Sequence, residues 1–302
     1  MSVDQTATHA VPPMRARRAT PWPASGPAPW PAGPASGVVI VDATDATDAT
    51  DATPARRHRV TWTAVRTAAT ELGLIAVVYL VYRAARLLTA GSVATAHRHS
   101  ELVRDVERLL HLPSEAAIQQ AVGGAWLFEA ANVYYVGVHF PLTITFLVWG
   151  FVARPRAEYR WARNLLVVQT LTAVAGHIAF PLAPPRMFPQ WGFLDTMSHY
   201  GPSAYDGASA TVANQYAAMP SLHVGWAVLI AVVVARTGPR WLGWLAAAHA
   251  LITFAVVTVT ANHWFVDTLV AVALLGLALA VFPAPGRTRL PRRPSRASRG
   301  AS

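Results

Sequence analysis

Stretches of apolar residues long enough to cross a lipid bilayer recur along this sequence, and they limit what it can fold into. A helix needs about 20 consecutive, mostly apolar residues to cross the hydrocarbon core. Runs of roughly this kind lie near residues 66–89, 126–152, 163–183, 219–236, 240–260 and 263–283. They predict an all-α integral membrane bundle of about six transmembrane helices.

The composition supports the same class of protein. Of the 302 residues, 53% are hydrophobic and only 13% are charged, and the mean hydropathy is +0.32. These values are too apolar for an ordinary soluble domain. The absence of cysteine excludes disulfides, thiolate metal ligands and cysteine nucleophiles. Histidine and carboxylate side chains are therefore left to carry the chemistry.

A more polar segment separates the first two apolar runs. Between residues 98 and 122, charged side chains alternate with a set of apolar ones that share one helical face: Leu102, Val106, Leu109 and Leu110. This pattern predicts an interfacial helix between the first two spans, broken near Pro113 because proline interrupts a helix.

Two tails flank the apolar part of the chain. Residues 1–60 are rich in Pro, Ala, Ser and Thr and contain an Asp-Ala-Thr repeat at 42–53, which predicts a disordered N-terminal tail. Residues 61–285 are expected to form the transmembrane domain. Residues 286–302 are expected to form a basic cytoplasmic tail.

The arginines indicate how the bundle is oriented. The net charge is +10, which by itself would also fit a nucleic-acid-binding protein. However, the arginines gather before, between and after the runs: Arg56, Arg57, Arg59, Arg154, Arg156, Arg160, Arg163, Arg236, Arg240 and those beyond 286. The positive-inside rule explains this without nucleic acid. We expect a multi-pass plasma-membrane protein with both termini in the cytoplasm and the loop at about 184–218 outside.

Three short motifs lie at the predicted outer ends of the spans. They are Pro184-Pro-Arg-Met187, Met219-Pro-Ser-Leu-His223 and Asn262-His-Trp-Phe-Val-Asp267. The i, i+4 spacing of the last histidine and aspartate lets the carboxylate orient the imidazole. Pro220 suits a first helical position and Asn262 an N-cap, so both histidines should lie in first helical turns. Two positive helix ends and an arginine would then favour a phosphate ester.

These motifs resemble those of the type-2 phosphatidic acid phosphatase superfamily, and especially its inositol-phosphorylceramide-synthase-like branch. Pro-Pro-Arg, Pro-Ser-Leu-His and His-three-residues-Asp occur in the expected order between residues 184 and 267. Leu222 replaces the usual glycine, and Val256-Val257 stand where a Ser-Arg pair is common. One phosphate-binding arginine of the commoner pattern is therefore missing, a change that the synthase-like branch tolerates.

The resemblance implies a role for each residue of the site. His263 would attack phosphorus to give a phosphohistidine, Asp267 would orient its ring, and His223 would protonate the leaving oxygen. Arg186 and Ser221 would hold the phosphate oxygens. Neither a metal nor another cofactor is expected.

The predicted function is therefore that of a lipid phosphotransferase or phosphatase that acts at the outer face, inositolphosphotransferase-like, on a phospholipid or polyprenyl phosphate. Membrane lipids are the expected partners, while the headgroup, the acceptor and the oligomeric state stay open. A proton- or metal-coupled transporter that uses the same His/Asp cluster is the alternative. A zinc hydrolase is disfavoured because His-Glu-x-x-His is absent.

Six further polar residues are candidate components of the site: Asn132, Tyr135, His139, His177, Asp195 and His199. The first three share a face of the second span, where interhelical packing is favoured over lining a lipid-phosphate cavity. His177 could line the pocket or serve packing, and it stays outside the predicted catalytic set. Asp195 and His199 mimic the i, i+4 spacing, but their Gly- and Pro-containing loop predicts solvated residues.

Overall fold

A computed structural model describes residues 62–89, 92–204 and 215–286 of the chain. The predicted disordered tail at 1–60 and nearly all of the predicted basic tail at 286–302 lie outside these residues. Within them the chain forms helices and no strand, apart from one isolated bridge between Leu182 and Ala217. The all-α prediction is therefore confirmed for the described part of the chain.

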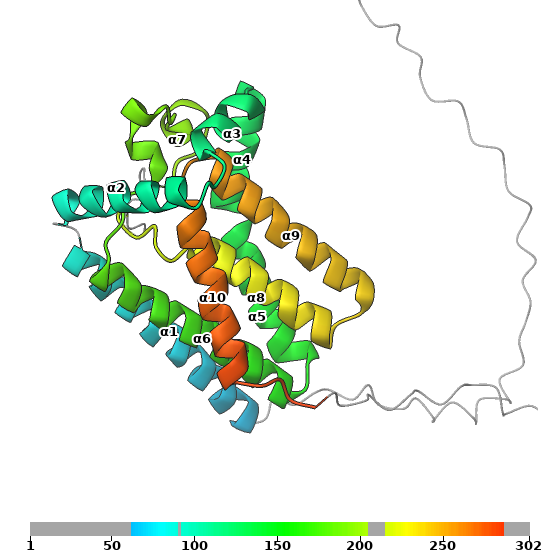
Figure 1. Cartoon of the computed structure of the whole chain (residues 1–302). Coiled ribbons are helices and arrows are strands. Elements are labelled where there is room, and N and C mark those ends of the chain that lie inside the picture. The colour runs from blue at the N-terminus through cyan, green and yellow to red at the C-terminus, as the bar shows by residue number, and fades with distance from the viewer. Residues whose placement is uncertain (1–61, 90–91, 205–214, 287–302) are drawn as a thin grey trace, which may run out of the picture. The chain divides into compact units, whose positions relative to one another are not determined.

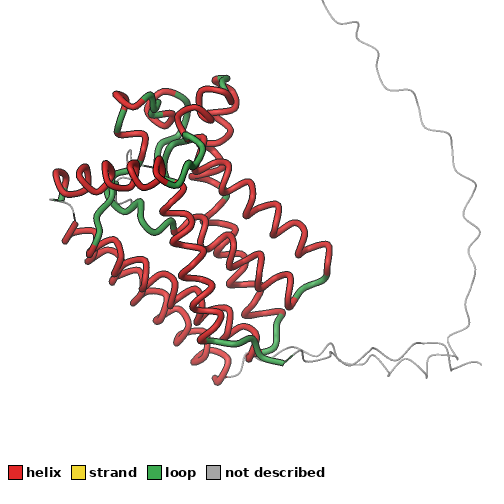
Figure 2. Tube along the Cα trace, in the orientation of Figure 1, coloured by secondary structure: helices red, strands yellow, loops and turns green. Residues whose placement is uncertain are grey.

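The long helices run alongside one another, and α2 crosses one end of them (Figures 1 and 2). The short helices α3 and α7 lie at that same end (Figure 1). The elements are α1 (Trp62–Thr89), α2 (Val93–Leu109), α3 (Glu115–Val122), α4 (Ala125–Gly137), α5 (His139–Ala153), α6 (Arg156–Ala179), the 3₁₀ turns η1 (Pro185–Met187) and η2 (Pro189–Trp191), α7 (Thr196–His199), α8 (Leu222–Thr237), α9 (Arg240–Val259) and α10 (Phe265–Val281).

Among the described residues, three helical segments are long and apolar enough to cross a membrane: Val65–Leu87, Ala125–Ala153 and Arg240–Val259. Two further apolar helices, α8 and α10, have 16 and 17 residues. At 1.5 Å per residue they extend only about 25 Å, less than the roughly 30 Å hydrocarbon core. The remaining predicted span, at 163–183, corresponds to α6 (Arg156–Ala179), whose first turns carry charged side chains. The count of six crossings therefore stays a prediction.

One break in the helices was predicted, and a second one was not. The predicted interfacial helix is interrupted near Pro113, as expected, and Ser114 caps α3 by accepting the Ala117 N–H. The second apolar run was expected to form one helix, but it is divided at Val138 into α4 and α5. Pro141 explains the division, because a proline ring cannot donate to the carbonyl four residues earlier and clashes with it.

The apolar core lies between α5, α6, α8 and α10. Its most buried members include Leu165 of α6, Leu229 and Val233 of α8, and Leu275 of α10. A second cluster, around Phe188 and Trp264, packs α2 and the turns η1 and η2 against the start of α10. The two clusters hold the beginnings of α8 and α10 in fixed positions. These helix beginnings carry the predicted catalytic histidines.

Candidate active site

Backbone hydrogen bonds join the three sequence motifs at the α2 end of the bundle. The Arg186 N–H, in η1, donates to the Ala261 carbonyl at 2.9 Å, just before the histidine motif. The Ser221 N–H, at the start of α8, donates to the carbonyl of Asp267 at 3.2 Å. The structure therefore brings together all the residues of the predicted site, although they lie up to 81 positions apart in the sequence.

The surroundings of His263 determine which of its ring nitrogens carries the proton. Nδ1 lies 3.0 Å from the Ala218 carbonyl oxygen and 3.4 Å from Oδ2 of Asp267. Both oxygens are acceptors when Asp267 is ionised, so Nδ1 is assigned as the N–H donor and Nε2 keeps the lone pair. His263 is 6% exposed and Asp267 is fully buried. This arrangement prepares Nε2 of His263 to act as a nucleophile or base.

The position of His263 relative to its helix differs from the prediction. The N-cap of α10 is Trp264 rather than Asn262, so His263 lies in the turn before the helix. The N-cap of α8 is Ser221, and Pro220 precedes it after a cis peptide bond. His223 does lie in the first turn of α8, as expected. The Asp267 carboxylate folds back over the helix start and also accepts the Trp264 N–H at 2.9 Å.

The beginning of α10 is not an open anion site, contrary to the prediction. The Phe265 N–H donates to Oε1 of Glu115 at 3.0 Å, and the Val266 N–H donates to Oε1 of Glu107 at 2.9 Å. These side chains, from α3 and α2, satisfy donors that a helix end would otherwise offer to a phosphate. Burial and the neighbouring Glu115 raise the pKa of Glu107 to about 9, so this carboxyl holds a proton at neutral pH.

The imidazole of His223 lies close to that of His263. Its ring centroid lies 5.8 Å from that of His263, and Tyr135 stacks on it with centroids 4.2 Å apart. Tyr135 is thus a wall of the site as well as a packing residue. A proton held by His223 is close to any group bonded to a phosphorus at His263.

Arg186 is buried and held by two side chains. Its Nε donates to Oδ1 of Asn262 at 3.1 Å, and its Nη1 donates to Oδ2 of Asp195 at 3.1 Å. The other carboxylate oxygen of Asp195 accepts the N–H groups of Met197 and Ser198 and so caps α7. Asp195 was predicted to be a solvated loop residue; its side chain is 30% exposed, but the prediction missed its ion pair with Arg186 and its role as the cap of α7. His199 is exposed, as predicted.

Three other polar residues brace the site. The Ser221 hydroxyl accepts the Val224 N–H at 3.4 Å as the N-cap of α8, which leaves its own O–H proton for a further acceptor. Nε2 of His177 lies 3.2 Å from the Pro220 carbonyl, so it supports the backbone before Ser221. Asn132 binds backbone carbonyls of α7 and its flank, which agrees with the favoured packing role.

Val256 and Val257 form an apolar wall where the commoner superfamily pattern has Ser-Arg. Both are buried, in one cluster with Tyr135 and Val224. Among the described residues no three His, Cys, Asp or Glu side chains gather so that they could hold a metal ion.

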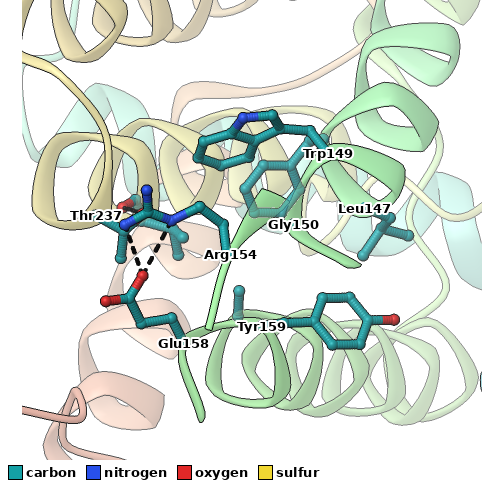
Figure 3. A pocket seen from close by; sticks show the side chains of 10 residues that line it. Leu147, Trp149, Gly150, Arg154, Glu158, Tyr159 and Thr237 are labelled. Carbon is teal, nitrogen blue, oxygen red and sulfur yellow. Dashed lines mark hydrogen bonds and ion pairs between the residues drawn. The ribbon is translucent and has the colours of Figure 1, made fainter. Parts of the chain in front are cut away.

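Two pockets in the described part of the chain differ in how close they lie to His263. One, of about 10 Å³, is lined by Trp149, Gly150 and Tyr159 beside the Arg154–Glu158 ion pair (Figure 3). It lies at the far end of α8, roughly 20 Å from His223 by the helical rise. The other, of about 200 Å³, lies next to the start of α10 and is lined by residues that include Glu107, Glu115, Trp191 and Trp264.

The fold and the site together define a helical membrane protein with a buried His-Asp pair facing a second histidine and an arginine. The family model described as the PAP2 superfamily matches residues 101–281, so the chain belongs to that superfamily. Membership suggests phosphatase or phosphotransferase activity on phosphorylated lipids and supports an enzyme. The predicted resemblance is thereby confirmed at the level of the superfamily. No curated protein and no solved structure matches the chain.

Proposed function

We propose that the chain is a membrane-embedded lipid phosphotransferase or phosphatase that acts through a phosphohistidine on His263. The observation that carries the proposal is the placement of Nδ1 of His263 between the Ala218 carbonyl and the Asp267 carboxylate. It leaves Nε2 with a lone pair, opposite His223 and near a buried arginine. The site therefore contains a nucleophile, an acid and a cation for the phosphate oxygens.

The reaction then proceeds in two halves. In the first, Nε2 of His263 bonds to phosphorus, the bond from phosphorus to the leaving oxygen breaks, and His223 gives that oxygen a proton. In the second, His223 removes the proton of an acceptor hydroxyl, whose oxygen bonds to phosphorus as the bond to Nε2 breaks. Arg186 and the Ser221 hydroxyl hold the other oxygens, and no metal takes part in either half. Water as acceptor gives a phosphatase, and an alcohol gives a transferase.

The substrate in this proposal is a phosphorylated lipid headgroup, on a phospholipid or a polyprenyl chain, presented at the outer face of the plasma membrane. The arginine-rich segments at the opposite ends of the spans support this orientation. Val256 and Val257, in place of a Ser-Arg pair, support an inositolphosphotransferase-like enzyme over the commoner phosphatases, because that branch tolerates the change.

The test is turnover of a panel of lipid phosphates by purified protein in the presence of a chelator. Phosphate release and headgroup transfer are both measured, for wild type and His263→Ala. We expect activity in wild type that His263→Ala lacks, and product only with added alcohol if the enzyme is a transferase. No turnover of any lipid phosphate, or equal turnover by both proteins, would contradict the proposal and favour transport by the same cluster. Activity that the chelator abolishes would contradict the metal-free mechanism.

A further inference from the structure

His139 is a buried imidazole for which the described residues provide no hydrogen bond. It begins α5 at the break in the second apolar run and is 1% exposed. Neither Nδ1 nor Nε2 has a hydrogen-bond partner among the residues that the structure describes. An imidazole always has at least one N–H donor, and burying it unsatisfied costs free energy. Intramembrane ionisable groups of this kind are costly unless they are used.

The neighbours of His139 include two more histidines. Its ring centroid lies 4.7 Å from that of His223 and 5.8 Å from that of His249. Nε2 of His223 and Nε2 of His249 also lack a partner among the described residues. The other ring nitrogen of His249 lies 2.6 Å from the hydroxyl of Tyr134. The orphaned nitrogens therefore belong to three adjacent rings, one of which is the proposed acid.

The acid role of His223 needs an acceptor at its buried nitrogen. Before it protonates the leaving oxygen, His223 carries a proton on both ring nitrogens, and each N–H must be stabilised. The ring of His139 is closer to His223 than that of His263, which is 5.8 Å away. A lone pair on His139 is thus the nearest imidazole acceptor, and one bridging water molecule would connect it to His223.

We propose that His139 is a positioning residue that accepts a hydrogen bond from protonated His223 and so enables it to act as the acid. The inference rests on the proposed function. In this arrangement a bridging water molecule accepts the N–H of His139 and donates to Nε2 of His249, and the Nδ1–H of His249 donates to the Tyr134 oxygen. Every unpartnered nitrogen of the three histidines then has a role. The series of hydrogen bonds ends at the Tyr134 hydroxyl, which can accept or donate.

The experiment compares two phosphate esters that differ in their need for an acid. An alkyl phosphate has a poor leaving group and needs the proton from His223, whereas an aryl phosphate such as p-nitrophenyl phosphate leaves as a stable phenolate. For His139→Phe we expect kcat/KM, which reports the first half-reaction alone, to fall roughly tenfold on the alkyl ester and less than twofold on the aryl ester. His139→Gln, which can accept a hydrogen bond, should recover most of the loss.

The ratio of the two kcat/KM values does not depend on how much of the protein is active, so partial misfolding of His139→Phe does not change it. The matched control is Thr143→Val, one turn further along α5, where the buried hydroxyl bonds to the His139 carbonyl of the same helix. It should leave the ratio unchanged. An equal loss on both esters, or no loss on either, would overturn the inference while the proposed function stands. Wild-type protein that turns over neither ester would overturn the proposed function itself.

Discussion

Asp195 holds Arg186 with one carboxylate oxygen and caps a helix with the other. Oδ2 accepts from Nη1 of the arginine at 3.1 Å, while Oδ1 accepts two backbone N–H groups at the start of α7. On its other side, the arginine donates through Nε to Asn262, the neighbour of His263. The loop that carries Asp195 and the segment that carries His263 are therefore joined through the guanidinium that is proposed to bind phosphate.

Asp195→Asn tests whether this ion pair positions the arginine. The amide oxygen of asparagine can still cap α7, because Asn and Asp are comparable N-caps, but the charge pairing is lost. We expect kcat/KM for a lipid phosphate to fall roughly tenfold, as for a lost charge-assisted hydrogen bond, with little change in melting temperature. Ser198→Ala, at an exposed position in the same turn, should not alter kcat/KM. Higher activity in Asp195→Asn would show instead that the carboxylate competes with substrate.

Asp267→Asn tests the assignment of the His263 tautomer. The asparagine can present an N–H₂ group to Nδ1, which favours the tautomer with the proton on Nε2 and removes the nucleophilic lone pair. By analogy with carboxylate-to-amide changes in other His-dependent enzymes, kcat should fall by roughly three to four orders of magnitude. Steady-state rates and circular dichroism of the purified variant would measure this. A loss below fivefold would show that the Ala218 carbonyl suffices to set the tautomer.

The carboxyl pair at the start of α10 predicts a pH dependence of stability. The pKa of Glu107 is raised from 4.5 to about 9, mainly by burial and then by Glu115. Between these values the unfolded chain releases a proton that the folded protein keeps, so stability falls as pH rises from about 4.5 to about 9. Glu107→Gln removes this titration and keeps an oxygen for the Val266 N–H. We expect a higher melting temperature than wild type at pH 8 and a shallower decline from pH 5 to 9.

The matched control for that prediction is Glu101→Gln, because Glu101 is exposed on the same helix, α2. Its melting temperature should follow the wild-type pH profile. If Glu107→Gln lowers the melting temperature at pH 8, the carboxyl acts there as a charged cap, and the account of the pair is wrong.

Gly176 of α6 lies against the proline that precedes the His223 helix. A Cβ at this position would lie 2.9 Å from Cδ of Pro220, a ring that cannot rotate away. Gly176→Ala should therefore displace the backbone before Ser221, with a cost of about 1–3 kcal/mol in stability and a loss of activity. Gly276→Ala is the control, since no atom lies within 4 Å of its added Cβ, and alanine favours a helix. Equal activity of the two variants would show that this contact does not position His223.

The sequence identified the residues that meet at the candidate site. It did not predict the hydrogen bonds that hold them at the helix ends. The apolar runs located α1, α8, α9 and α10 within a few residues, because a long apolar pattern depends only on local composition. His263, Asp267, His223 and Arg186 were found because their motifs are short and contiguous. The N-cap of α10 was misplaced by two residues, since Asn262 binds the arginine and Asp267 folds back to cap the helix.

The contacts that sequence alone could not reveal come from distant segments. Glu107 and Glu115 cap a helix about 150 residues later in the chain, and their own surroundings in sequence look like an ordinary amphipathic face. Asp195 lies in a loop whose glycine and proline content favours a solvated turn. Its partner is identified only when η1 and α7 fold against each other. The apolar runs predict six spans, and this count stays a prediction because α8 and α10 are short.

His263 is proposed to become phosphorylated during turnover. The most direct measurement mixes the enzyme with a ³²P-labelled aryl phosphate and rapidly quenches the reaction without acid. The product to detect is an acid-labile, base-stable phosphoenzyme. Wild type should carry the label, and His263→Ala should carry none. His223→Ala should accumulate it, because the aryl group leaves without an acid while the second half-reaction lacks its base. Turnover by wild type without any labelled enzyme, or equal labelling of His263→Ala, would contradict the account.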